Sequence, residues 1–372
     1  MKPATKLNFP DIRKARAVKN RIEYLDGHRG LAILLVVAFH AYARWPELVP
    51  YGDAYGNIPP FKYGWLGVEL FFLVSGFVIL MTLENCTGAG EFLFRRWLRL
   101  FPAMLFCSLL IFFTAGIFFE RPDGAPSVAS LLPGLTFMEW SWWQSVLGIP
   151  VKPLEGGFWS LYVEVKFYIF AAIIYFWRGR NWLVGALIGA FAVGTFCKVA
   201  EVYVGGAAIS ALNNLCRNLS LEYFGWFAAG AAFYVYSKSR NYKWLLGATA
   251  LAVLSSAFVR AFHWPTFVVA CLVSLFFAAS VLSPLIRRIL QHRFFQFFGF
   301  ISYPLYLLQE NMLISMLAKL GKVNMNLPAY LYPVLPVALL SVTAYLVARH
   351  IEPNFRKAIV GLALKSPFHR AT

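Results

Sequence analysis

The chain alternates long apolar stretches with short polar segments along most of its length. Ten of the stretches approach the ~20 residues that an α-helix needs to cross a bilayer. The pattern therefore predicts an all-α fold, a polytopic membrane bundle of about ten transmembrane helices. The predicted spans are 26–44, 64–83, 100–119, 159–177, 181–199, 220–237, 243–260, 264–283, 299–318 and 329–348.

The Lys and Arg residues between the apolar stretches predict how the helices are oriented. If the N-terminus is cytoplasmic, the cytoplasmic segments hold 23 Lys and Arg and the outer segments hold 9. Cytoplasmic loops of membrane proteins carry the excess of these residues. We therefore expect an N-in and C-in arrangement, with both termini in the cytoplasm.

Composition supports a membrane protein and argues against the usual partner of a basic chain. Apolar residues make up 59% of the chain and charged residues 14%, against about 45–50% and about 25% in soluble domains. The net charge of +17 would suit nucleic-acid binding in a soluble protein. Here the basic residues lie between apolar stretches, so we expect membrane lipid and no nucleic acid as a partner.

The lengths of the polar segments predict a single membrane domain. Residues 1–24 form a basic cytoplasmic segment without the apolar core of a signal peptide. Residues 25–350 form the membrane domain and 351–372 a short cytoplasmic tail. The longest loop, 121–158, is expected on the outer side. The five cysteines form no CxxC pair, so we expect no disulfide framework and no metal site.

Charged and titratable residues inside the apolar stretches are the first candidates for chemistry, because burying them in lipid is costly. Arg29 and His40 are eleven residues apart in the first predicted helix. At 100° per residue they share one face, separated by about 16 Å along the axis. Taken alone, His40 would be interpreted as a buried histidine whose hydrogen bonds are met by a neighbour. Arg29 would be interpreted as an anchor whose side chain extends to the membrane interface. Together they favour a site in which a neutral His40 acts as a base.

Two carboxylates lie in the second and fourth predicted helices. Glu69 falls within an apolar run, and His40 or Arg29 is a possible partner for it. Glu164 lies a short way into its helix and also needs a partner. Ser75 is not set in a Gly-x-Ser-x-Gly turn, so we expect it to pack against a neighbouring helix and not to act as a nucleophile.

Three arginines precede the third predicted span. Arg95 and Arg99 are i,i+4 neighbours on one helical face, and Arg96 points elsewhere. Anchoring by the positive-inside rule accounts for them well. The functional alternative is a clamp for an anionic donor, because guanidinium groups bind phosphate bidentately.

Several blocks, taken together, resemble the integral-membrane acyltransferase-3 family. LDGHRG followed by Phe39 and His40 is similar to the Arg-x10-His signature of that family. Further blocks follow in the family's order, namely GVELFFLVSGF, FRRWLRLFPA, WSLYVEVKFY, ISYPLYLL and the late IEP.

The resemblance implies a ten-helix enzyme of the bacterial inner membrane. It would move an acetyl or other short acyl group from acyl-CoA to a hydroxyl of an exopolysaccharide, lipopolysaccharide or lipo-oligosaccharide, with acyl-CoA as a substrate and no bound cofactor. It also implies His40, Arg29, Glu69 and Glu164 as catalytic-site residues, with His40 either taking the proton of the acceptor hydroxyl or briefly carrying the acyl group itself. The donor-binding residues would be Arg95, Arg96 and Arg99.

This sequence departs from the family pattern at three positions. Glu69 stands where many members have Asp, His28 replaces an apolar residue, and Gln309 follows YLL where a His is common. We therefore assign no catalytic histidine at position 309. The competing interpretation is a carrier or flippase for a lipid-linked saccharide, which ten helices with buried charges would also fit, although no pair of broken, repeat-related helices is evident.

Overall fold

The computed structural model describes residues 22–258, 263–323 and 328–365. Within these ranges every regular element is a helix, which confirms the predicted all-α class. Parts of three predicted segments lie outside the described residues: most of the N-terminal segment 1–24, the end of the span 243–260 and the end of the tail 351–372.

Six helical stretches in the described ranges are long and apolar enough to cross a membrane. They coincide with six of the ten predicted spans. The stretches are Gly64–Leu83, Ala89–Thr114, Gly156–Arg178, Arg180–Tyr203, Trp264–Leu282 and Ala329–Leu362. Their helices are α3 (Gly67–Leu83), α4 (Ala89–Thr114), α7 (Trp159–Arg178), α8 (Arg180–Tyr203), α12 (Trp264–Leu282), and α16 (Val334–Leu346) with α17 (Glu352–Lys365).

The other four predicted spans coincide with shorter helices. These are α1 (Glu23–Phe39), α10 (Phe224–Ser239), α11 (Tyr242–Phe258), and the pair α14 (Arg293–Leu308) and α15 (Asn311–Val323). Short helices that the apolar pattern did not predict lie between the long ones: α2 (Pro59–Lys62), α5 (Leu131–Thr136), α6 (Trp140–Leu147), α9 (Ala207–Asn218) and α13 (Pro284–Leu290).

Helix α4 begins eleven residues before the predicted start at residue 100. The apolar pattern marked only its apolar part, while its first turns carry the three arginines. At the earlier start, one carboxylate oxygen of Glu91 accepts hydrogen bonds from the Thr87 amide at 2.8 Å and the Thr87 hydroxyl at 2.7 Å. This contact ties the first turn of α4 to the residue that precedes its N-cap, Gly88.

The predicted span 299–318 is broken near its middle. Helix α14 ends at Leu308 and α15 begins at Asn311, so Gln309 and Glu310 lie at the junction. The side chains of Glu310 and Asn311 bind the backbone and side chains of the loop before α7. These contacts hold the break and place three consecutive polar residues in the interior of the protein.

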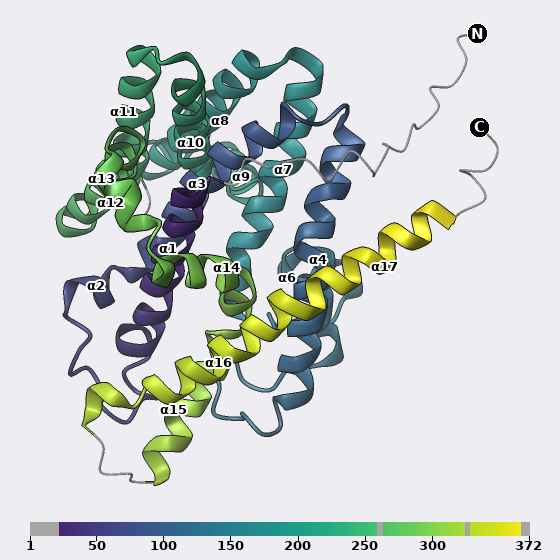
Figure 1. Cartoon of the computed structure of the whole chain (residues 1–372), viewed down its shortest axis with the longest axis vertical. Helices are drawn as coiled ribbons and strands as arrows, with labels where there is room; N and C mark the ends of the chain where they lie inside the picture. The colour runs from purple at the N-terminus through teal and green to yellow at the C-terminus, as the bar shows by residue number, and fades with distance from the viewer. Residues whose placement is uncertain (1–21, 259–262, 324–327, 366–372) are drawn as a thin grey trace.

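Glycines bring the central helices into close contact, as small residues do in membrane bundles. Helix α1 packs against α14 and α3 at the centre of the molecule (Figure 1). A Cβ atom at Gly30 would lie 2.1 Å from the carbonyl oxygen of Phe295, and one at Gly299 would lie 2.1 Å from that of Asp26. No larger side chain fits at either position without separating α1 from α14. This contact holds Arg29 beside α14.

The far end of α1 changes from α-helical to π-helical geometry at His40. The turn His40–Arg44 follows Phe39 directly. Such π-helical turns are rare and often mark functional sites. Arg29 and His40 are joined by regular α-helix up to Phe39, the geometry on which the predicted alignment of the two residues rests.

Candidate active site

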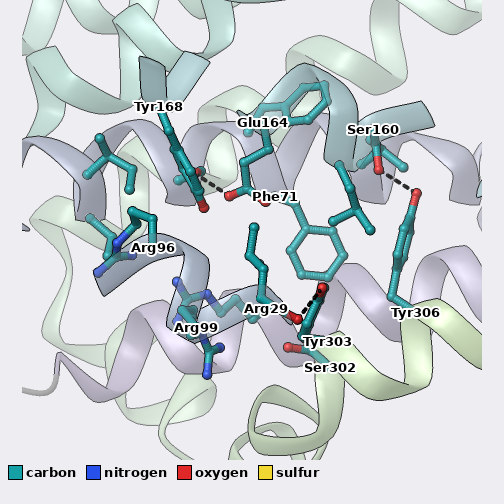
Figure 2. A pocket seen from close by; sticks show the side chains of 17 residues that line it. Arg29, Phe71, Arg96, Arg99, Ser160, Glu164, Tyr168, Ser302, Tyr303 and Tyr306 are labelled. Carbon is teal, nitrogen blue, oxygen red and sulfur yellow. Dashed lines mark hydrogen bonds between the residues drawn. The ribbon is translucent and has the colours of Figure 1, made fainter. Parts of the chain in front are cut away.

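A cavity opens among α1, α3, α4, α7 and α14, the helices that carry most of the predicted site residues (Figure 2). It encloses about 730 Å³ of space when its opening is included. Its polar lining comes from three arginines, one carboxylate, three serines and three tyrosines. They are Arg29, Arg96, Arg99, Glu164, Ser75, Ser160, Ser302, Tyr168, Tyr303 and Tyr306.

Three guanidinium groups stand around one side of this cavity (Figure 2). Arg29 comes from α1 and is held by Asp26 at 3.2 Å. Arg96 and Arg99 come from α4, where Arg96 lies 3.4 Å from the Thr82 hydroxyl and Arg99 lies 3.8 Å from Glu352. The structure thus brings Arg29 together with two of the three arginines predicted to bind the donor.

Arg95 is not among the described residues that line the cavity. Its guanidinium pairs with Glu91 one turn earlier in α4. The prediction that Arg95 and Arg99 share the relevant face is therefore corrected: it is Arg96 and Arg99, at i,i+3 spacing, that face the cavity together.

Glu164 enters the cavity from α7, and its predicted need for a partner is met by Ser75 of α3. The Ser75 hydroxyl donates to Glu164 Oε1 at 2.6 Å. This contact agrees with the expectation that Ser75 supports packing, and it adds that the hydroxyl orients a carboxylate at the cavity wall. Glu164 and Tyr168 also lie within electrostatic range of Arg29.

His40 lies outside the cavity lining and is held by the break between α14 and α15. Its Nδ1 lies 2.6 Å from Gln309 Oε1, and its ring stacks on Trp45 at 5.6 Å between centroids. Because the amide oxygen can only accept, Nδ1 carries the proton and Nε2 keeps its lone pair. The orienting role that the sequence suggested for Glu69 is thus taken at Nδ1 by Gln309.

Nε2 of His40 faces a second carboxylate, that of Glu310, with 3.9 Å between Nε2 and Oε1. The other oxygen of Glu310 accepts a hydrogen bond from the amide of Gly157. The carbonyl of the same glycine accepts from the Tyr306 hydroxyl at 2.8 Å, and Tyr306 lies 2.7 Å from the Ser160 hydroxyl. Since Tyr306 and Ser160 line the cavity, a short polar path joins the cavity to His40.

Glu69 is buried in α3 with 2% of its surface exposed. It is not among the residues that line the cavity, but it lies within electrostatic range of the Tyr306 hydroxyl, as do Glu164 and Glu310. All three carboxylates thus act electrostatically on one tyrosine, whose hydroxyl belongs to the polar path between the cavity and His40.

A polar network closes the protein next to Glu310. Asn311 donates to Glu155 at 2.8 Å and to Asp123 at 2.7 Å. Asp123 accepts from the amide of Gly156 at 3.0 Å, and Arg121 lies 3.8 Å from Glu155. Burial, with the nearby charge of Glu310 as the next cause, raises the pKa of the Glu155 carboxyl well above its usual range. The network fastens the long loop to the start of α15.

A comparison with known families shows which kind of domain these helices form. Residues 22–348 match the model of the acyltransferase-3 family, described as an acyltransferase domain. The chain belongs to the acyltransferase-3 family. The match spans the whole bundle from the start of α1 to the end of α16.

Three relatives give this acyltransferase domain its context. It is 26% identical over 171 residues to the peptidoglycan O-acetyltransferase OatA of Listeria monocytogenes. The aligned region is 42% of this chain and 24% of OatA. It is 28% identical over 165 residues to a provisionally named O-acetyltransferase of Staphylococcus aureus, or 40% of this chain and 24% of the relative. It is 29% identical over 194 residues to BcsY of Komagataeibacter xylinus, a provisionally named membrane-bound transacylase, or 49% and 45% of the two chains.

The matched region covers about a quarter of OatA and less than half of BcsY. The apolar helices and the family together identify the acyltransferase as a membrane protein.

Sequence reasoning missed the parts of the site that surround His40 from α14 and α15. The available signal was the run Gln309, Glu310 and Asn311 inside an otherwise apolar stretch, since polar residues at such depth need a function or a partner. His28, whose role the sequence left open, is fully buried and bonds Ser280 at 2.7 Å away from the cavity. The described residues contain no group of three His, Cys, Asp or Glu side chains that could hold a metal.

Proposed function

We propose that the protein is a membrane O-acyltransferase that moves an acetyl or other short acyl group from acyl-CoA to a hydroxyl of a carbohydrate-type acceptor. The observation that carries this proposal is the cavity itself, which has three guanidinium groups at its wall and a polar path to an oriented histidine. The family and the names of its relatives support acyl transfer to oxygen.

Acyl-CoA fits the charges of the cavity. The donor carries several phosphate charges, which Arg29, Arg96 and Arg99 can bind through charge-assisted hydrogen bonds. These charges cannot enter hydrocarbon cheaply, whereas the slender pantetheine arm can pass inward. Arg29 and His40 are offset by about 16 Å along α1. This distance would let the phosphates bind at the arginines while the pantetheine arm carries the thioester to His40.

His40 performs the chemistry in this proposal. Gln309 fixes the tautomer in which Nε2 can accept a proton. As the acceptor oxygen bonds to the acyl carbon, its proton passes to Nε2. The carbon–sulfur bond breaks, the sulfur keeps the electron pair, and the proton on His40 is then available to the departing thiolate. Glu164 and Glu69 are the carboxylates of the site, whereas Arg95, which pairs with Glu91, lies outside the cavity and has no part in donor binding.

The fold is compatible with ten crossings. We infer that α1, α10, α11 and the broken pair α14–α15 cross the membrane with the six long helices, that both termini are cytoplasmic and that the host membrane is a bacterial inner membrane. The 23-to-9 distribution of Lys and Arg supports this orientation. It places the arginines on the cytoplasmic side, where acyl-CoA is made, and His40 towards the other side.

A transfer assay tests the proposal against the carrier alternative. Membrane vesicles that contain the full-length protein are supplied with labelled acetyl-CoA, and the label is counted in the glycolipid and polysaccharide fraction. An O-acyltransferase releases free CoA in step with the transferred label, whereas a carrier for lipid-linked saccharide releases none. Absence of both label and free CoA would contradict the proposal.

A further inference from the structure

We propose that Glu310 stabilises the positively charged form of His40 that arises during acyl transfer, and so acts as a positioning residue for the reaction. The inference rests on the proposed function, because it assigns a second acid–base group to that site. It starts from the geometry at His40 Nε2, which faces Glu310 Oε1 at 3.9 Å.

The neutral amide of Gln309 leaves the charge of His40 uncompensated. In a Ser-His-Asp arrangement a carboxylate contacts the Nδ1–H group and stabilises the imidazolium. Here an uncharged oxygen occupies that place, so Nδ1 is oriented without gaining a counter-charge. A carboxylate is nevertheless present, on the opposite side of the ring.

The separation of 3.9 Å makes the contribution of Glu310 specific to the charged state. It is too long for a hydrogen bond, so a neutral His40 gains little from the carboxylate. Once Nε2 has taken the proton of the acceptor hydroxyl, a cation and an anion face each other in a buried site, where charges attract strongly. An interaction that strengthens along the reaction raises the rate, whereas one that is equal throughout does not.

Two glycines hold the Glu310 carboxylate in this position. The amide of Gly157 binds the oxygen that faces away from His40. A Cβ atom added at Gly157 would lie 2.9 Å from Oε2, and one at Gly156 would lie 3.0 Å from Oε1. A side chain at either glycine would therefore press on the carboxylate and shift it from its present position.

The charges around Glu310 come from two elements. The turn after α1 contributes His40 and Arg44, and the long loop contributes Arg121, Asp123 and Glu155. Arg121 lies 3.8 Å from Glu155, and Arg44 lies over the ring of Trp45, which stacks on His40. Tyr306 of α14 is also within electrostatic range of Glu310, and His40 is the titratable group that faces Glu310 Oε1 directly.

Substitution of Glu310 by Gln tests the inference through the pH profile of transfer. In vesicles with full-length protein and saturating labelled acetyl-CoA, E310Q should lower the transfer rate about 100-fold at neutral pH, in the usual range for acid–base groups. Its acidic limb should move to lower pH, because His40 without its counter-charge loses its proton more readily. Binding of acetyl-CoA should remain within about twofold of wild type, as expected for a site on the separate arginine wall.

Three further variants keep the test decisive. Glu120→Gln removes a carboxylate that pairs with Lys319 and Lys322 away from the site, and it should match wild type. Glu310→Asp keeps the charge, so its acidic limb should stay near the wild-type position while its rate falls. Gly157→Ala should shift the limb in the same direction as E310Q but less, and it carries the test if E310Q does not bind acetyl-CoA.

The inference is overturned if E310Q keeps a rate within threefold of wild type, or if it loses rate while its acidic limb stays in place, as a purely structural residue would. The inference is also overturned if Gly157→Ala changes neither the transfer rate nor the acidic limb of the pH profile. A wild-type protein that transfers no acyl group would overturn the proposed function and this inference together, whereas an active wild type with an unaffected E310Q overturns this inference alone.

Discussion

His40 Nδ1 and Gln309 Oε1 are 2.6 Å apart, although 269 residues separate them in the chain. This contact joins the end of α1 to the break between α14 and α15. It selects one tautomer of His40 and fixes the direction in which Nε2 points. The histidine of the family signature is therefore oriented by the residue that stands where a second histidine is common.

Loss of the Gln309 amide should slow transfer without abolishing it. Gln309→Ala frees the ring of His40, and misplacement of a reacting group by about 1 Å can cost up to 100-fold. We expect a fall of roughly 10- to 100-fold in the transfer rate, with unchanged binding of acetyl-CoA. Gln309→Glu restores an acceptor at Nδ1 and should recover part of the rate. Equal rates for Gln309→Ala and wild type would contradict an orienting role.

Replacement of His40 should remove nearly all transfer. His40→Gln keeps the size and polarity of the side chain but has no basic nitrogen, and general base catalysis contributes about 10²- to 10⁴-fold. Acyl transfer is compared with wild type at matched amounts of membrane-inserted protein. His263→Gln is the control, because His263 is exposed and contacts only Thr266 among the side-chain bonds described. Near-normal activity of His40→Gln would end the assignment.

The two cavity-facing arginines of α4, Arg96 and Arg99, should matter more for binding of the donor than their neighbour Arg95. Hydrogen bonds to charged groups contribute about 1.5–3 kcal/mol each, so Arg96→Ala or Arg99→Ala should raise the apparent KM for acetyl-CoA roughly 10- to 100-fold. Arg95→Ala is the matched control from the same helix, since Arg95 pairs with Glu91 outside the cavity. A similar rise for all three variants would indicate a general effect of charge at the membrane surface.

Reporter fusions should place the two ends of the proposed passage on opposite sides of the membrane. Fusions after Lys62 and after Lys152 are expected to report the outer side, and a fusion after Arg180 the cytoplasm, from the distribution of Lys and Arg. The measurement is the activity of a reporter that works on one side only. A cytoplasmic signal after Lys62 would place His40 on the same side as the donor and remove the basis for a passage.

Glu155 should make the stability of the protein fall as pH rises. Its raised pKa means that the folded protein keeps a proton which the unfolded chain loses above about pH 4.3. The free energy of unfolding therefore decreases between that pH and the raised pKa, by about 1.4 kcal/mol for each unit of difference. Glu155→Gln stays neutral and keeps an oxygen that can accept from Asn311.

Thermal unfolding in detergent at pH 5 and pH 8 measures this effect. The apparent Tm of Glu155→Gln should change less between the two pH values than that of wild type. Glu120→Gln serves as the control for loss of one carboxylate. An unchanged pH dependence in Glu155→Gln would show that the buried carboxyl does not control the stability in this range.

The sequence predicted the helical class and one face of the site because both follow from local periodicity. The spacing of Arg29 and His40 is a property of a single helix, and the regular geometry of α1 up to Phe39 preserves it. Likewise, six predicted spans coincide with long apolar helices. Where two residues lie on the same helix, their spacing could be predicted from the sequence.

Relationships between helices were not predictable in the same way. The i,i+4 spacing of Arg95 and Arg99 suggested a shared face, but Arg95 pairs with Glu91, and it is Arg96 that lines the cavity with Arg99. Similarly, Gln309 and Glu310 meet His40 across the contact between α1 and α14, where Gly30 and Gly299 let the two helices touch. No periodicity of one segment encodes which distant segment it will contact.

The stretch from Ala329 to Leu362 is longer than the hydrophobic layer is thick. Its 34 residues would extend about 51 Å at 1.5 Å per residue, against about 30 Å of hydrocarbon. In Figure 1 it runs diagonally across the molecule and ends well beyond it. Only its first part, α16, is apolar, and charged residues begin at Arg349, so we expect the stretch to leave the hydrocarbon layer near Glu352. Glu352 lies 3.8 Å from Arg99. On that expectation the arginines of the cavity would stand level with the lipid headgroups, and a charged donor could bind there with its phosphates still hydrated.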